Sequence, residues 1–325
     1  MEDNRKILYM VIPCYNEEEV LPDSSKELLD KLNRLIEQKL IADESRVLFV
    51  NDGSKDNTWN IIKGLCEADD HYIGISLAHN KGHQNALLAG LMVAKEHADI
   101  VVSMDADLQD DINAIDEMIA KYEEGCDIVY GVRSKRDKDS FLKRSTAEGF
   151  YKLMRILGAD TVYNHADFRL MSRRALESLA QYKEVNLFLR GIVPMLGYKT
   201  DCVYYERGER LAGESKYPPR KMLAFAWEGI TSLSITPIRL ISTGGGIVFL
   251  VSIVMMIYSL IRHAQGATVA GWSSLIISIW MIGGVILLSI GIVGEYIGKI
   301  YLETKARPRY IIEEELMSDE DKGIV

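Results

Sequence analysis

The sequence predicts an α/β protein in which a mostly parallel sheet carries helices on both faces, followed by a C-terminal hairpin of two transmembrane helices. Through the first two thirds of the 325 residues, short apolar strands alternate with helical patterns, which is typical of a parallel sheet. Residues 238–261 and 273–298 are apolar and nearly free of charge. About 20 such residues cross about 30 Å of hydrocarbon as a helix. The alternative is a pair of buried helices in a soluble domain.

The elements of the soluble half follow one another in a regular order. The pattern predicts strands over 6–12, 46–50, 72–77, 99–104 and 126–131, and helices over 18–38, 57–66, 84–97 and 112–123. Neither a repeat of fixed period nor a low-complexity tract interrupts this order. We therefore expect one soluble domain over residues 1–217.

The charge on either side of the apolar segments predicts their orientation. Basic residues flank the pair on both outer sides, whereas the loop 262–272 holds one Arg and one His. By the positive-inside rule both flanks are cytoplasmic, which predicts a multi-pass protein of the inner or plasma membrane with its large N-terminal domain in the cytoplasm. A signal peptide is not expected, because the N-terminal apolar run is short and is followed by acid.

The segments around the hairpin complete the predicted domain plan. Residues 218–236 read as an interfacial amphipathic helix, with a helix packed on the soluble domain as the alternative. The hairpin occupies 237–299, and 300–325 form a cytosolic tail whose acidic part, 313–322, is expected to be disordered. The four cysteines are far apart and form no C-x-x-C, so reduced thiols are expected rather than disulfides or a zinc site.

Polar clusters follow four of the predicted strands. They read "PCYNEE", "NDGSKDNT", "AHNKGHQNA" and "DADLQD". Since ligands of such sheets bind beyond the carboxyl ends of the strands, we expect these clusters to form one site. Dinucleotide-binding and P-loop enzymes are disfavoured, because no G-x-G-x-x-G follows the first strand and G-x-x-x-x-G-K-[ST] occurs nowhere.

The acidic pair Asp105 and Asp107 predicts a metal site. Two apart at the end of a strand, the carboxylates project to the same side. Oxygen ligands suit a hard divalent cation, so Mg²⁺ or Mn²⁺ is expected to hold a diphosphate there. An isolated D-x-D can also be a turn or a helix cap. In "HADFRLMS", Asp167 and Arg169 share one face of an extended segment, which favours a joint role over the alternative of a structural pair at a sheet edge.

Taken together, "IPCYNEEE", "NDGSKDNT", "NKGHQNAL", "MDADLQD", "ADFRLMSRR" and "GESKY" resemble the family 2 inverting nucleotide-sugar glycosyltransferases over about residues 7–310. The match is to the polyprenyl-phosphate branch, with its bactoprenol glucosyltransferases and dolichol-phosphate mannosyltransferases. The resemblance implies a GT-A fold and transfer of a sugar from a nucleotide diphosphate to undecaprenyl (polyprenyl) phosphate, for cell-envelope glycan modification. UDP-glucose is the preferred donor, and UDP-N-acetylglucosamine and GDP-mannose stay open.

The resemblance also implies roles for particular residues. Asp105 approaches the nucleoside and, with Asp107, the metal; Asp167 matches the catalytic carboxylate and Arg169 a phosphate-contacting partner. Whether Asp167 acts as a base or only orients groups stays open, because a phosphate acceptor with a second pKa of about 6 is already largely ionised. The implied donor site comprises Pro13, Tyr15, Asn16, Glu17, Asp52, Gly53, Ser54, Asn80, Lys81, Asp105, Ala106 and Gln109.

An anionic acceptor calls for cations. Candidates for binding its phosphate are Arg133, Arg136, Lys143 and Lys216. Such basic runs are also common on solvated faces or against anionic lipid.

Other functions fit the sequence less well. A polymerising glycosyltransferase is disfavoured because Q-x-x-R-W and further spans are missing. A non-catalytic nucleotide-sugar-sensing scaffold or flippase partner is the alternative of another class. No nucleic-acid partner is expected, and a homo-oligomer is compatible with the glycines of the second span.

Overall fold

The computed structural model describes residues 5–134, 165–206, 231, 236–264 and 271–317. These residues belong to two compact units. The first contains 5–134, 165–206 and 307–317, and the second contains the long C-terminal helices. Each unit is described by itself.

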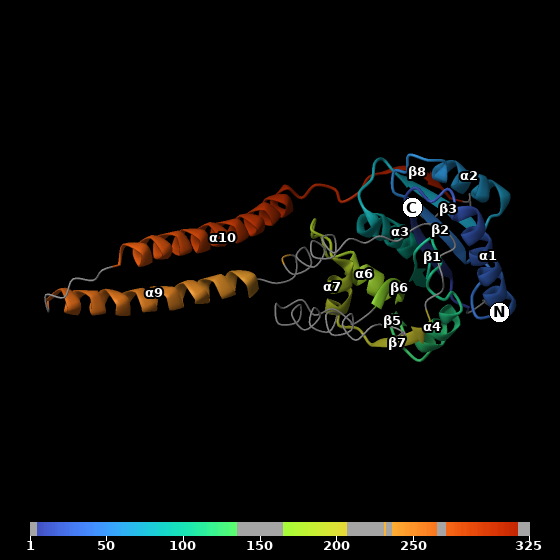
Figure 1. The fold of residues 1–325 in the computed structure, drawn as a ribbon. Coiled ribbons are helices and arrows are strands. Elements are labelled where there is room, and N and C mark those ends of the chain that lie inside the picture. Colours follow the sequence, from blue (N-terminus) through green and yellow to red (C-terminus); the bar gives the residue numbers. More distant parts are fainter. Residues whose placement is uncertain (1–4, 135–164, 207–230, 232–235, 265–270, 318–325) are drawn as a thin grey trace. The chain divides into compact units, whose positions relative to one another are not determined.

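The first unit is built on an eight-stranded sheet with the order β7-β5-β6-β4-β1-β2-β3-β8 (Figure 1). β1, β2, β3 and β4 run parallel to one another, while β6 and β8 are antiparallel to their neighbours. The strands are β1 (Leu8–Cys14), β2 (Arg46–Asn51), β3 (Tyr72–Leu77), β4 (Ile100–Ser103), β5 (Ile128–Arg133), β6 (His165–Ser172), β7 (Thr200–Tyr205) and β8 (Ile312–Leu316). The five predicted strands and the α/β class are confirmed.

Helices cover both faces of this sheet. One apolar cluster packs α1 (Leu21–Glu37), α2 (Thr58–Ala68) and α4 (Ala114–Glu123) on one face. On the other face a second cluster packs α3 (His83–His97), α6 (Arg173–Leu179) and α7 (Leu189–Met195). Because both faces are covered, the central strands are buried along their whole length, as the continuous apolar runs of the sequence indicated.

The expectation that 313–322 are disordered is wrong for its first residues. Ile312–Leu316 form β8, which pairs antiparallel with β3 at the edge of the sheet. The Glu314 carboxylate accepts a hydrogen bond from Trp59 Nε1 at 2.9 Å and lies 2.7 Å from Lys63 Nζ, both on α2. The side chains of β8 alternate between half-buried and exposed, so acidic residues occupy the solvent side of an edge strand.

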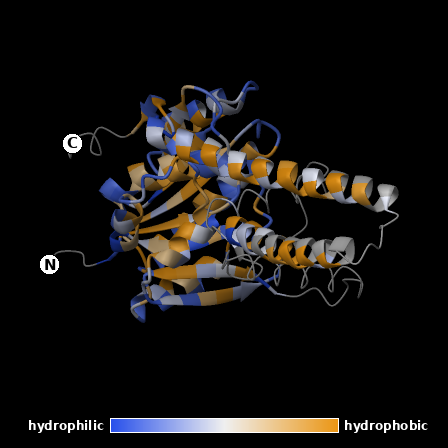
Figure 2. Cartoon of the chain, turned by 90° about the vertical axis from the view of Figure 1, so that its left-hand side faces the viewer, coloured by the Kyte–Doolittle hydropathy of each residue, from blue (hydrophilic) through white to orange (hydrophobic). Residues whose placement is uncertain are grey.

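The second unit contains α9 (Thr236–Ala264) and α10 (Trp272–Lys305), which begin and end close to the two predicted spans. Figure 2 shows both helices coloured mainly as hydrophobic. Within the described residues, one segment, Met281–Lys305, is long and apolar enough to cross a membrane. The two-span hairpin stays a prediction. Nearly all of the predicted interfacial helix, 218–236, lies outside the described residues.

Candidate functional site

Seven strand ends meet at one edge of the sheet. The carboxyl ends of β1, β2, β3, β4, β5 and β7 lie there, together with the first residues of the antiparallel β6. The polar clusters that follow β1 to β4 are therefore brought together, as the sequence predicts. The arrangement places an acidic loop from β4 opposite the acid and arginine of β6.

The loops after β1 and β2 are fastened to each other. Asn16, with a left-handed φ of 54°, donates its backbone N–H to Ser54 Oγ, and its side-chain oxygen accepts from Lys55 N. Glu17 N donates to Thr58 Oγ1 at 2.9 Å. The exposed Tyr15 stands just before this joint. These contacts give Asn16 and Ser54 a defined structural task beside any role in binding a donor.

The loop after β3 is held by Asp52. Its carboxylate is 2% exposed and accepts the backbone N–H groups of Lys81 at 2.7 Å and Gly82 at 2.9 Å. Burial raises the pKa of Asp52, against the two N–H groups, which lower it. Gly53 has φ +62°, and a Cβ there would lie 2.6 Å from Asn80 N. Glycine is therefore required where this loop approaches β2.

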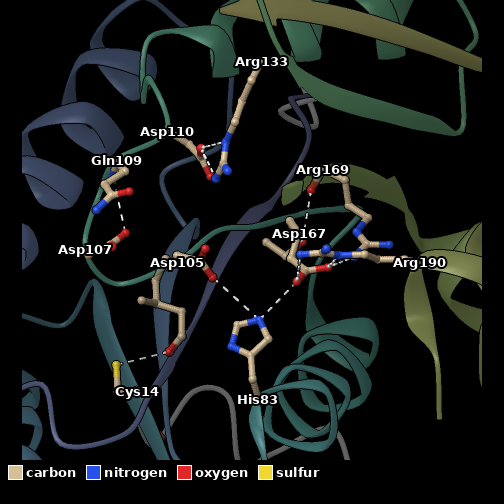
Figure 3. Close-up of polar contacts among 12 residues, drawn as sticks. Cys14, His83, Asp105, Asp107, Gln109, Asp110, Arg133, Asp167, Arg169 and Arg190 are labelled. Atoms are coloured by element: carbon tan, nitrogen blue, oxygen red, sulfur yellow. Dashed lines mark hydrogen bonds and ion pairs between the residues drawn. The ribbon is translucent and has the colours of Figure 1, made fainter. Parts of the chain in front are cut away.

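The loop after β4 carries the predicted metal ligands. Asp105 and Asp107 are half-buried, and Gln109 N lies 3.4 Å from Asp107 Oδ1 (Figure 3). Asp110 is buried and anchors the loop, because its Oδ1 accepts from Arg133 Nε at 3.0 Å, Arg133 Nη2 at 2.9 Å and the Tyr205 hydroxyl at 2.7 Å. The loop is thus tied to the ends of β5 and β7.

Asp167 lies at the centre of a cationic cluster. Its Oδ1 accepts from Arg169 Nη2 at 2.8 Å and Arg190 Nε at 3.2 Å, and its Oδ2 accepts from Arg190 Nη2 at 3.0 Å. His83 Nε2 lies between two carboxylates, 3.4 Å from Asp167 Oδ2 and 3.6 Å from Asp105 Oδ1 (Figure 3). Both oxygens of Asp167 are therefore engaged by positive or potentially positive groups.

Burial and the neighbouring charges lower the pKa of one member of this cluster and raise the pKa values of two others. Burial raises the pKa of Asp167, but His83, Arg169 and Arg190 outweigh burial and hold it well below the usual range. Burial raises the pKa of Asp105, and the carboxylates of Asp167, Asp110 and Asp107 add to the rise while His83 opposes it. Burial lowers the pKa of His83, but Asp167 and Asp105 raise it above its ordinary value. Asp167 is a stably ionised carboxylate, whereas Asp105 stands in an excess of negative charge.

The structure does not expose every predicted residue. Arg169 is 1% exposed and packs behind Asp167, so it presents no surface to a phosphate here. Arg133 is directed onto Asp110. Pro13, Ala106 and Gln109 are buried, while Asn80 and Lys81 lie in the loop after β3. Arg136, Lys143 and Lys216 lie outside the described residues.

Three residues of the site were missed by the sequence reasoning. His83 stands inside the quoted motif "NKGHQNAL", and its place at the start of a helix behind a strand could have drawn attention to it. Asp110 is the last residue of the quoted cluster "DADLQD", so its place in that cluster was the available signal. Arg190 comes from α7, and no local pattern connects it with Asp167, 23 positions away.

The oxygen ligands that the loop after β4 offers fit a divalent cation. Asp105 and Asp107 supply oxygen ligands. Burial is the main cause of the raised pKa of Asp105, and the nearby carboxylates of Asp167, Asp110 and Asp107 add negative charge that a cation would offset. Among the described residues, no group of three or more His, Cys, Asp or Glu side chains is arranged to hold a metal ion. Mg²⁺ is commonly bound through one or two carboxylates, with substrate phosphates and water completing the shell. Asp105 and Asp107 supply the two carboxylates of that pattern.

Comparison with known proteins agrees with this geometry. Residues 9–180 match the family described as glycosyl transferase family 2. Uncharacterized glycosyltransferase YkoT of Bacillus subtilis (strain 168) is 53% identical over 320 residues, 98% of this chain and 95% of the relative. The bactoprenol glucosyl transferase of Shigella phage SfV is 42% identical, over 94% of this chain and 98% of the relative.

The fold can also be set beside solved structures of low sequence identity. Glucosyl-3-phosphoglycerate synthase from Mycobacterium tuberculosis, in complex with Mn²⁺, UDP and phosphoglyceric acid, is 17% identical with a TM-score of 0.45 and covers 70% of this chain and 77% of its own. The family match over residues 9–180 supports the GT-A-like α/β fold that the sequence predicts. From the family match and the full-length relatives, we conclude that this chain is a glycosyltransferase and belongs to glycosyl transferase family 2.

Proposed function

We propose that this enzyme is a membrane-anchored inverting glycosyltransferase that moves glucose from UDP-glucose to the phosphate of undecaprenyl (polyprenyl) phosphate. The observation that carries the proposal is the 42% identity to a relative named bactoprenol glucosyl transferase, which extends over 94% of the chain and so includes α9 and α10 as well as the site. UDP-N-acetylglucosamine and GDP-mannose are the competing donors. The product would serve cell-envelope glycan modification.

The reaction is a single displacement at the anomeric carbon. An oxygen of the acceptor phosphate forms the new bond to C1 while the bond from C1 to the donor diphosphate breaks, and UDP leaves with the electron pair. A phosphate monoester at neutral pH is already ionised, so this attack requires no proton acceptor. The ionised and fully engaged Asp167 supports a role in orienting charged groups rather than in taking a proton.

We assign the donor to the edge formed by the loops after β1 to β4. Asp105 and Asp107 would hold Mg²⁺ or Mn²⁺ with the diphosphate, and the metal would supply charge neutralisation for the leaving group. Asp52 keeps the loop after β3 in place, and Gly53 lets it approach. His83 and Arg190 bring positive charge to the side of the site where two anions must meet.

We place the acceptor in a membrane that α9 and α10 cross as a hairpin. The apolar composition of both helices and the basic residues outside them support a multi-pass protein of the cell membrane with its catalytic domain in the cytoplasm. A lipid phosphate is presented at the headgroup level, so an anchored enzyme meets it without extracting the lipid. Arg136, Lys143 and Lys216 remain the proposed cations for that phosphate, and a homo-oligomer is compatible with the hairpin.

A donor panel tests the proposal. Detergent-solubilised enzyme, undecaprenyl phosphate and Mg²⁺ or Mn²⁺ are incubated with radiolabelled UDP-glucose, UDP-N-acetylglucosamine or GDP-mannose, and label is counted in the organic extract. The proposal expects UDP-glucose to label the lipid fastest, with the anomeric configuration inverted in the product. Faster labelling by another donor would correct the sugar. If no donor labels the lipid although the folded protein binds a nucleotide, the sensing or scaffold reading replaces the transferase.

A further inference from the structure

The first turns of α3 and α7 are joined directly beside Asp167. Leu189 N donates to Gln84 Oε1 at 2.8 Å, linking two helices that are 105 positions apart in the sequence. The neighbours of these two residues, His83 on α3 and Arg190 on α7, both reach the Asp167 carboxylate. The hydrogen bond between Gln84 and Leu189 therefore holds together the two helices whose side chains, His83 and Arg190, contact Asp167 on β6.

Arg190 grips Asp167 in a different way from Arg169. Arg169 is 1% exposed and donates from Nη2 to one carboxylate oxygen. Arg190 donates from Nε to one oxygen and from Nη2 to the other, and about a third of its side chain is exposed, 34%. A two-point grip fixes the plane of the carboxylate, whereas a single hydrogen bond leaves the plane free to rotate.

We propose that Arg190 is a positioning residue of the transfer reaction, which acts by holding the Asp167 carboxylate in the plane that faces His83 and, through His83, the donor-side Asp105. The inference rests on the proposed function, because it assigns a role in the same site. The planar guanidinium is required for this grip, and a lysine ammonium supplies the charge without the two-point geometry.

The structure offers a matched control at the opposite ends of the strands from the site. Arg174 on α6 also holds a carboxylate by two nitrogens, with Nε 3.2 Å from Asp127 Oδ1 and Nη2 in contact with Oδ2. Asp127 precedes β5, so this pair lies at the end of the strand away from the site. Arg174→Gln removes an arginine–aspartate pair of the same kind without touching the acids and arginines of the site.

The test compares Arg190→Gln, Arg190→Lys and Arg174→Gln in the lipid-labelling assay, with thermal melts to establish that each variant is folded. A misplaced reactive group costs on the order of 100-fold in rate. We expect Arg190→Gln to lower kcat by about that factor with KM for UDP-glucose within about threefold of wild type. Arg190→Lys recovers part of the loss, and Arg174→Gln leaves both constants unchanged.

A double variant separates positioning through Asp167 from an independent effect. Once Asp167→Asn has removed the carboxylate that Arg190 holds, Arg190→Gln should change kcat by less than about threefold further. Full additivity of the two losses, an unchanged kcat in folded Arg190→Gln, or a rise in KM alone would each overturn the inference. Inactive wild-type enzyme would overturn the proposed function and this inference with it, whereas active wild type beside an unaffected Arg190→Gln overturns the inference alone.

Discussion

The backbone of Gly53 controls how closely the loop after β3 approaches the end of β2. We predict that Gly53→Ala raises KM for the nucleotide sugar and destabilises the first unit by at least about 1 kcal/mol, the cost of left-handed backbone in a residue with a Cβ. The clash with Asn80 N at 2.6 Å adds to that cost because backbone must move. Gly64→Ala on α2 is the control: its Cβ meets nothing within 4 Å and Ala favours a helix, so its melting temperature should stay or rise.

Asp107 is expected to be essential for metal-dependent binding. Because a diphosphate and the acids at this edge repel each other, UDP should bind poorly once the cation or one of its ligands is removed. Calorimetric titration with UDP should show tight binding in Mn²⁺, a loss of at least about tenfold in EDTA, and a similar loss in Asp107→Asn. Glu117→Gln, an exposed acid on α4, is the matched control. Equal UDP affinity with and without the cation would contradict this assignment.

The cysteines should react slowly in the folded enzyme. Burial raises the pKa of the Cys14 thiol well above its ordinary value and that of Cys66 to about 12, and it also raises the pKa of Cys202. The thiolate is the reactive form, so little of it exists at pH 8. Titration with Ellman's reagent should detect these thiols slowly in native protein and all four after denaturation. Fast stoichiometric reaction of the native protein would contradict the raised pKa values of these thiols.

At the level of single residues, the sequence located the acids better than the cations. Asp105 and Asp107 could be assigned because a strand immediately precedes them and fixes which way they project. The same alternation placed Asp167 and Arg169 on one face of β6, with Phe168 and Leu170 in the opposite core cluster. Arg190 could not be found in this way, since only the tertiary joint between Gln84 and Leu189 brings it to Asp167.

The C-terminal strand shows why one element escaped prediction. Three of the five residues of β8 are glutamates, so its sequence resembles a solvated acidic tail. Its half-buried side chains, Ile312, Glu314 and Leu316, face the protein, and Glu313 and Glu315 are exposed. As an antiparallel edge strand it shields the β3 edge, and its neighbour Ile311 accepts a hydrogen bond from Ala78 N just before the donor loop. The alternating strands and helices before it were predictable because each has a characteristic spacing of apolar residues and is bounded by turn-forming residues.

We predict that Glu314→Ala lowers the melting temperature while Glu315→Ala does not. Glu314 contacts Trp59 and Lys63, whereas Glu315 faces solvent on the same strand. The hydrogen bonds from Lys63 and Trp59 lower the pKa of Glu314 in the folded state. Its contribution is therefore present above the ordinary pKa of a glutamate and is lost as pH falls through the lowered value. The difference in melting temperature between the two variants should accordingly shrink in acid, and equal melting at neutral pH would contradict the contact.

For the whole molecule, the central question is whether the chain crosses the membrane twice. The hairpin predicts that Thr268→Cys, between the two apolar segments, is labelled in intact cells by a membrane-impermeant maleimide. Lys199→Cys, in the catalytic unit, should be labelled only after the cells are permeabilised, and the wild-type chain gives the background of the native thiols. Labelling of Lys199→Cys in intact cells would invert the proposed orientation, and protection of both positions would argue against two spans.

The account as a whole claims that one site joins a nucleotide sugar to a lipid phosphate. The most direct measurement is the molar ratio of UDP released to glucose recovered in lipid, with undecaprenyl phosphate as acceptor and undecaprenol as the control that lacks the phosphate. The account predicts a ratio close to one, with transfer that depends on Mg²⁺ or Mn²⁺ and is absent with undecaprenol. UDP release without labelled lipid, or equal transfer to undecaprenol, would contradict it.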